Sequence, residues 1–344
     1  MLLQVALAIG NDARVFAMAR IRYTTSQFPA ALGAALAGSH VVDVSWSELL
    51  WAAISVGRAE LQHIFQYGRF SAFEIVYRSA LVYANLCEMP TGHVRRSEAY
   101  DGLDPSEKSA ISYFMGLTLV KLFADRLLQV PYLMHLDVYR AQLQAVMQPG
   151  RSRPDLVGRN TAGDWIIVES KGRTNEYDDD AMDKAKQQTQ LVVTIGGAAP
   201  VLRVAGQAHF EDGMLECSLV DPKAKRRKRS KRLDLPLSER DIVQEYYRPF
   251  RSWLNVAENK RQENVEGRPF TVARVPDVDV EVGLPDTLRV PGAAGPEGRR
   301  ERLLLQDRTY VGSDSVLVRP GELWTPDNMR REPQERRLPQ DQQG

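Results

Sequence analysis

Three side chains around one short interval have the chemistry that metal-dependent hydrolysis needs. Asp155 follows Pro154, and thirteen residues separate it from the tripeptide Glu169-Ser170-Lys171. Successive side chains of a β-strand point to opposite faces, so Glu169 and Lys171 would share a face that Ser170 does not. Two carboxylates that lie close together repel, and a divalent cation such as Mg2+ relieves that repulsion. The cation activates water and neutralises phosphoryl charge, while Lys171 would orient or deprotonate the water and stabilise negative charge.

These residues meet only if a hairpin joins them. The segment from Gly158 to Gly163 predicts a turn that would bring Asp155 beside Glu169. The β-branched run 166–168 is typical of a central strand that is buried on both faces. The surrounding pattern predicts a helix over 105–128, a strand near 132–138, a helix over 177–191, and strands over 200–205 and 214–220.

This order of elements resembles the PD-(D/E)XK nuclease superfamily, which has the restriction-endonuclease-like fold. The resemblance extends over residues 104–220 and implies a mixed β-sheet core flanked by helices. It also implies metal-dependent hydrolysis of phosphodiester bonds, usually in DNA, with Mg2+ or Mn2+ as cofactor. By this resemblance Asp155, Glu169 and the Ser170 backbone carbonyl would bind the metal, and Asp155, Glu169 and Lys171 would form the catalytic set. The (Asp/Glu)-x-Lys pattern recurs at 221–223 and 258–260, but without a hairpin before it and a helix after it.

Further polar residues are candidates for an extended site. Some members of the superfamily add an acidic residue from the first helix or strand, and the candidates here are Glu107, Asp125 and Asp137. Glu107 is also explained by a capping box with Asp104, and Asp125 by an ion pair with Lys121 or a neighbour. On the helix over 177–191 we predict nucleic-acid contacts from Lys186 and Gln187, with a solvated helix face as the equal alternative. The five histidines form no close pair in the sequence and are each expected to be structural.

The chain is almost neutral overall but contains one dense run of basic residues. The formal net charge is +1, from 45 Lys and Arg against 44 Asp and Glu, yet residues 223–232 carry eight basic residues in ten positions. We expect a basic loop that contacts phosphates without regard to sequence. The expected contacts are Lys225, Arg226, Arg227, Lys228 and Arg229. A solvated linker, a contact to an acidic partner and a nuclear-localisation signal are the alternatives.

The composition places the chain among soluble globular proteins. It has 344 residues, of which 43% are hydrophobic and 26% charged. Two cysteines in different segments exclude a disulfide scaffold and favour the cytoplasm, and no run of 18 apolar residues predicts a membrane span. The apolar start, residues 2–9, is expected to be a buried strand rather than a signal peptide.

The predicted architecture is α/β and has four parts. These are an α-rich N-terminal region (1–103), a nuclease core (104–256), a β-containing C-terminal extension (257–324) and a disordered tail (325–344). The core would end in a helix over 238–256 that Pro249 kinks or splits.

We therefore expect a cytoplasmic DNA nuclease, with a role in bacterial defence against foreign DNA implied by the resemblance alone. The N- and C-terminal regions would serve target choice, a homo-oligomer or a protein partner. Two alternatives stay open at this point: a non-catalytic nucleic-acid-binding or scaffold subunit that keeps the fold, and an RNA-directed nuclease.

Overall fold

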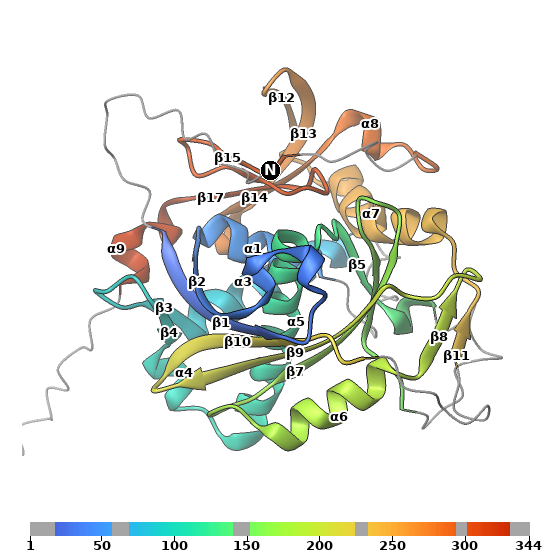
Figure 1. The fold of residues 1–344 in the computed structure, drawn as a ribbon. Helices are drawn as coiled ribbons and strands as arrows, with labels where there is room; N and C mark the ends of the chain where they lie inside the picture. Colours follow the sequence, from blue (N-terminus) through green and yellow to red (C-terminus); the bar gives the residue numbers. More distant parts are fainter. Residues whose placement is uncertain (1–17, 57–68, 140–151, 224–232, 294–300, 331–344) are drawn as a thin grey trace, which may run out of the picture.

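A computed structural model describes residues 18–56, 69–139, 152–223, 233–293 and 301–330 (Figure 1). The predicted strand over 2–9 and the five predicted phosphate contacts of the basic loop lie outside these residues. None of the helices in the described ranges is long and apolar enough to cross a membrane.

The largest sheet has nine strands and mixed direction. Its main path runs β2 (Gly38–Val44), β1 (Ala19–Ser26), β10 (Met214–Val220), β9 (Leu202–Glu211), β7 (Trp165–Gly172), β6 (Leu156–Arg159) and β5 (Tyr132–His135). The strands β5, β6 and β7 form an antiparallel meander, whereas β7 pairs with β9 in parallel. The short hairpin of β3 (Leu86–Glu88) and β4 (Val94–Arg96) attaches to β10. The predicted α/β class with a mixed sheet and flanking helices is confirmed.

Two helices cover opposite faces of the sheet at β7. On one side lies α5 (Pro105–Leu128), whose Gly116 and backbone at Ser112 lie directly against the end of β7. An added Cβ at Gly172 would come within 1.7 Å of the Ser112 carbonyl oxygen, so this close approach requires glycine. On the other side lies α6 (Asp179–Thr189), where Met182 and Ala185 pack against apolar residues of β9 and β10.

The helix ends follow the sequence signals. Asp104 and Glu107 form the predicted capping box at the start of α5. Ser45 caps α1 (Trp46–Ser55), which packs on α5 beside α3 (Arg69–Asn85); the short α4 (Glu98–Asp101) precedes α5. The helix α7 (Glu239–Val256) continues through Pro249, so proline does not split it, and the predicted kink stays a prediction.

The C-terminal residues build a separate six-stranded sheet, which is stacked above the helices in Figure 1. Its order is β12 (Arg261–Val265), β13 (Arg268–Val275), β14 (Val280–Pro285), β17 (Leu317–Pro320), β16 (Tyr310–Val311) and β15 (Leu303–Leu304), and α8 (Asp286–Arg289) follows β14. One face, which carries Ala273 and Val282, joins the main core. The other face carries Phe270 and Val272 and forms a smaller core with Leu317.

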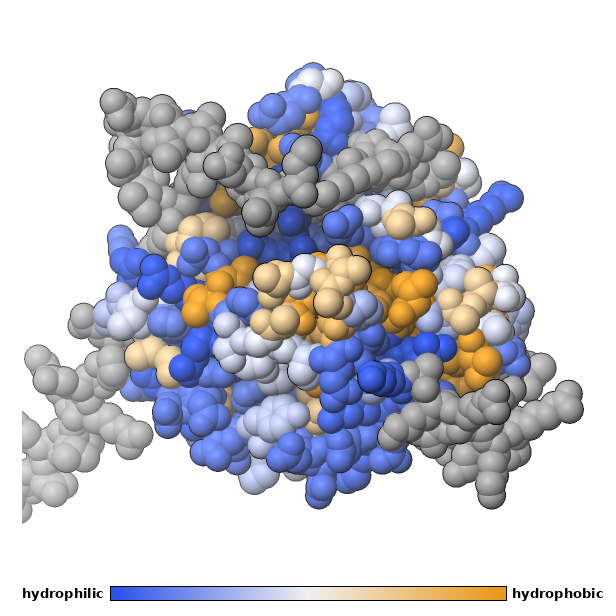
Figure 2. Space-filling view, viewed as in Figure 1, coloured by the Kyte–Doolittle hydropathy of each residue, from blue (hydrophilic) through white to orange (hydrophobic). Residues whose placement is uncertain are grey.

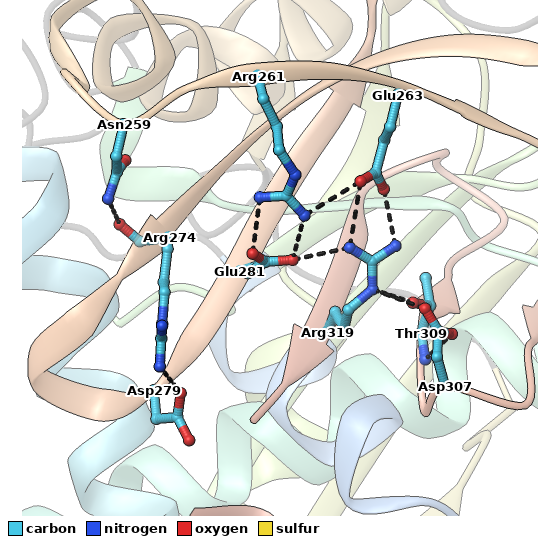
Figure 3. Close-up of polar contacts among 9 residues, drawn as sticks. All are labelled: Asn259, Arg261, Glu263, Arg274, Asp279, Glu281, Asp307, Thr309 and Arg319. Atoms are coloured by element: carbon cyan, nitrogen blue, oxygen red, sulfur yellow. Dashed lines mark hydrogen bonds and ion pairs between the residues drawn. The ribbon is translucent and has the colours of Figure 1, made fainter. Parts of the chain in front are cut away.

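An ion-pair network crosses the outer face of this sheet (Figure 3). Arg261 of β12 contacts Glu281 of β14 at 2.7 Å, and Arg319 of β17 bonds both Glu281 and Glu263 at 2.7 Å. Because opposite charges alternate among three strands, each carboxylate has two cationic contacts. The network therefore holds β12 and β17 to β14 without leaving an unpaired charge among these four residues.

The structure bears on two predicted boundaries. The strands β1 and β2 lie within the predicted α-rich region, and β1 pairs in parallel with β10 of the predicted core, so the two regions share one sheet. The predicted disordered tail begins too early, because α9 (Pro326–Met329) is folded. Met329 is fully buried there, and Arg330 bonds the buried Glu88 carboxylate at 3.0 Å. Residues 326–330 are thus held in place by one buried apolar side chain and one ion pair.

Several short elements lie outside the two large sheets and the long helices. The strands β8 (Val192–Ile195) and β11 (Leu233–Leu235) form a small parallel sheet beyond α6. Two short 3-10 turns, η1 (Ala30–Leu32) and η2 (Ala34–Leu36), join β1 to β2. Apolar residues gather in the middle of the face drawn in Figure 2, in the region where Figure 1 shows these turns, and Leu32 and Val41 are about half exposed.

Candidate active site

The β6–β7 hairpin brings Asp155 and Glu169 together. Leu156 pairs with Val168, so the two acidic residues are adjacent at the end of this register. The Asp155 backbone N–H donates to Glu169 Oε2 at 2.8 Å, and the Ser170 backbone N–H donates to Asp155 Oδ2 at 3.1 Å. Each carboxylate therefore accepts a hydrogen bond from the other strand's backbone, which fixes both side chains.

Lys171 lies on the same face as Glu169, as strand alternation predicts. Its Nζ donates to Glu169 Oε1 at 2.5 Å and to Gln188 Oε1 of α6 at 2.9 Å. The Gln188 amide in turn donates to the Arg153 carbonyl oxygen at 2.9 Å. Gln188 thus ties the lysine on β7 to the segment that precedes β6, and it holds the ammonium group beside the carboxylates.

The two carboxyl groups share a poorly solvated environment. The Glu169 side chain is 1% exposed, and burial raises its pKa to about 8; the nearby Asp155 charge adds to the shift and Lys171 opposes it. Burial also raises the pKa of Asp155 to about 6. The hydrogen bond from the Ser170 N–H and the charge of Lys171 both oppose this shift. Lys171 is 27% exposed, so this group reaches solvent while Glu169 does not. The pair therefore favours binding of a cation, which would stabilise both carboxylates.

His135 and Tyr113 extend the site, and the sequence interpretation missed them. His135 Nε2 lies 4.0 Å from Asp155 Oδ1, and the Tyr113 hydroxyl of α5 lies 3.3 Å from the same Nε2. The Asp137 backbone N–H donates to His135 Nδ1 at 3.2 Å, which fixes the ring. His135 pairs with Leu156 across β5 and β6, so the hairpin register would have placed this histidine beside Asp155.

The three candidate acidic residues have different surroundings. Glu107 acts in the capping box at the far start of α5. Asp125 is buried, and Arg302 and Ser313 of the C-terminal part donate to its carboxylate. Asp137 is the one of the three that adjoins the site, where it forms an ion pair with Arg153 and raises the pKa of Asp155.

The predicted nucleic-acid contacts on α6 lie one turn or less from the site. Lys186 forms an ion pair with Asp183 at 3.0 Å, and Gln187 is exposed. The next residue, Gln188, is the one that bonds Lys171 directly. The contacts of Lys186 and Gln187 with nucleic acid stay predictions.

The donor chemistry fits a hard divalent cation. Within the described ranges, no group of three or more His, Cys, Asp and Glu residues is placed to hold a metal ion. Two carboxylates are, however, the protein share that a Mg2+ site usually takes, with water and substrate phosphate completing the shell. Asp155 and Glu169 supply those oxygens, and the Ser170 carbonyl, next along β7, stays a predicted third ligand.

Comparisons with family models, with curated proteins and with solved structures give no match to this chain.

Proposed function

We propose that this protein is a Mg2+- or Mn2+-dependent nuclease of the PD-(D/E)XK type that hydrolyses DNA phosphodiester bonds. One observation carries the proposal: Asp155 and Glu169 are locked together at a hairpin end, and Lys171 lies against Glu169 on the same face. The strand order β5-β6-β7-β9-β10 between α5 and α6 supports it, because the resemblance implies the same mixed sheet between two helices.

Each residue has a distinct task in this proposal. Asp155 and Glu169 would hold the cation, which when bound supplies an activated water and charge neutralisation at the phosphate. Lys171 would hold the attacking water by a hydrogen bond and stabilise negative charge on the phosphoryl oxygens. Gln188 keeps the Lys171 ammonium in place, and the burial of Glu169 excludes bulk water from that side of the pair.

The deciding experiment compares cleavage of plasmid, linear duplex, single-stranded DNA and RNA with Mg2+, Mn2+ or EDTA. We expect cleavage of DNA that needs the metal and that Glu169→Gln and Lys171→Ala each abolish. Lys108→Ala is the matched control, since this α5 lysine bonds the Asp101 carbonyl away from the site. Wild-type rates in both site variants would refute the proposal. Cleavage of RNA but not of DNA would show instead that the protein is an RNA-directed nuclease.

A non-catalytic nucleic-acid-binding or scaffold subunit is the second candidate, and one observation favours it. Glu169 already has a cationic partner in Lys171, which contacts its carboxyl group directly. The two candidates differ in the binding of Mg2+ or Mn2+ measured by calorimetry. A nuclease should bind the ion and lose it in Asp155→Asn, whereas a scaffold should show no binding in either protein. A role in bacterial defence would be tested by plating phage on cells that carry wild type or Lys171→Ala.

A further inference from the structure

A strip of aromatic side chains runs across α3 and α5. Phe73 and Tyr77 are one helical turn apart on α3 and therefore share a face. The Tyr77 ring meets the Phe114 ring edge-on at 5.5 Å, and Phe114 meets Tyr113 at 5.4 Å. Phe73 is 63% exposed, Tyr77 40% and Tyr113 37%, while Phe114 is buried beneath them. We call Phe73, Tyr77, Phe114 and Tyr113 the aromatic strip.

The strip ends at the candidate active site. The Tyr113 hydroxyl lies 3.3 Å from His135 Nε2, and that nitrogen lies 4.0 Å from the Asp155 carboxylate. Tyr113 and His135 therefore connect the strip to the Asp155 carboxylate. This continuity distinguishes the strip from Leu32 and Val41, whose elements η1 and β2 lie beyond β1, at the opposite end of the main sheet from β5.

These rings differ in exposure from the aromatic residues of the core. Trp51, Tyr100 and Phe123 are buried, whereas Phe73, Tyr77 and Tyr113 each expose more than a third of their surface. Single exposed apolar residues need no explanation, but contiguous ones indicate a binding surface. Aromatic faces beside a site for phosphodiester chemistry match one ligand group in particular, because every nucleic-acid base has a π-face that stacks on such rings.

We propose that the aromatic strip stacks the unpaired bases of a single-stranded DNA segment and guides that strand to Asp155. The inference rests on the proposed nuclease function and deepens it by naming the substrate form. Bases in a duplex are already stacked on each other, so intact duplex gains nothing from these rings. The strip itself carries no charged group, so its contribution is independent of phosphate neutralisation and of salt.

The test separates binding from cleavage. Fluorescence anisotropy of a labelled oligothymidylate and of a blunt duplex is measured with the full chain in a Lys171→Ala background, at several salt concentrations. Phe73→Ala and Tyr77→Ala should each weaken single-strand binding about 5- to 150-fold and leave duplex binding and the salt slope unchanged. Tyr77→Trp should restore binding. Tyr177→Ala is the matched control, because Tyr177 is also 37% exposed but packs on His209 before α6.

The outcomes distinguish this inference from the proposed function. If single-strand affinity is unchanged, or if duplex binding falls equally, the strip does not stack bases and the inference is overturned. If the two α3 variants convert an oligomer to a monomer without changing DNA affinity, the strip is an interface between copies and the inference is equally wrong. DNA cleavage by the wild-type chain would still stand in both cases. Conversely, ring-dependent single-strand binding without any cleavage would keep the inference and refute the nuclease.

Discussion

Cation binding at the Asp155–Glu169 pair should release a proton, and the release should be larger at lower pH. Burial raises the pKa of Glu169 to about 8, so this carboxyl group retains its proton at neutral pH. A metal ligand must be deprotonated, so the cation and the proton compete for Glu169. The sign follows directly: below the raised pKa the proton must leave when the metal binds, and above it there is no proton to lose.

The expected size follows from that pKa. At about pH 6.5 binding should release about one proton, and at about pH 8.5 about a quarter of one. The apparent affinity should be about 25-fold weaker at about pH 6.5 than at about pH 8.5, whereas a carboxyl group with an ordinary pKa would give almost no change. The structural cause is the 1% exposure of the Glu169 side chain together with the charge of Asp155.

Titration calorimetry with Mn2+ in buffers of different ionisation enthalpy measures the proton count. Glu245→Gln is the control, because burial also raises the pKa of this second carboxyl group. Glu245 pairs with Arg248 at 2.6 Å on α7, a helix that carries none of the candidate site residues. The variant should leave the release unchanged, whereas Glu169→Gln should abolish binding. Metal binding with no proton release at either pH would refute the reasoning about Glu169.

Three further predictions address the framework around the site. Gly172→Ala should lower the free energy of unfolding by about 3 kcal/mol in urea denaturation, because the added Cβ would collide with the Ser112 carbonyl oxygen. Gly102→Ala is the control and should change little, since its added Cβ would meet no atom within 3.5 Å. Arg319→Met should cost about 2 kcal/mol in the same assay by leaving two partly buried glutamates short of a cation, and the loss should shrink in about 1 M salt. Gln188→Leu should lower kcat about tenfold and alter the pH–rate profile without changing unfolding, and an unchanged profile would contradict its positioning role.

Local signals predicted the centre of the molecule well. The capping box of Asp104 and Glu107 and the periodicity after it define α5, and the β-branched run 166–168 defines β7. The position of Asp155 beside Glu169 also followed, because a hairpin of this length has few registers. These features depend on residues that are close in the sequence, so composition and spacing suffice to find them.

Long-range pairings were beyond such reasoning. His135 reaches Asp155 only through the register of β5 on β6, and a single histidine gives no signal of its own in the sequence. The pairing of β1 with β10 joins residues about two hundred positions apart, and no local pattern selects that partner. The average effect of proline on helices predicts a kink or a break at Pro249. The helix α7 nevertheless continues through it, with its apolar residues packed in the core. In each case tertiary packing decided the outcome.

The helix α5 links the candidate site to the C-terminal sheet. Near its middle, Gly116 lies so close to β7 that an added Cβ would come within 2.9 Å of Ser170 Oγ. About two turns later, Asp125 accepts bonds from Arg302 and Ser313, which belong to the C-terminal part. One rigid helix therefore touches the strand that carries Glu169 and Lys171 and also the loop before β17.

This arrangement argues against a core, residues 104–256, that is independent of the C-terminal sheet. Lys121 is fully buried, where its Nζ donates to the Pro131 carbonyl at 2.5 Å and lies 4.5 Å from the centre of the Trp51 ring. Asp314 supplies the main opposing charge and also accepts from Trp51 Nε1 at 3.0 Å. A buried ammonium group without its carboxylate partner is strongly destabilising. The C-terminal sheet, which brings Asp314, is therefore part of what holds α5, and through α5 the backing of β7, in place.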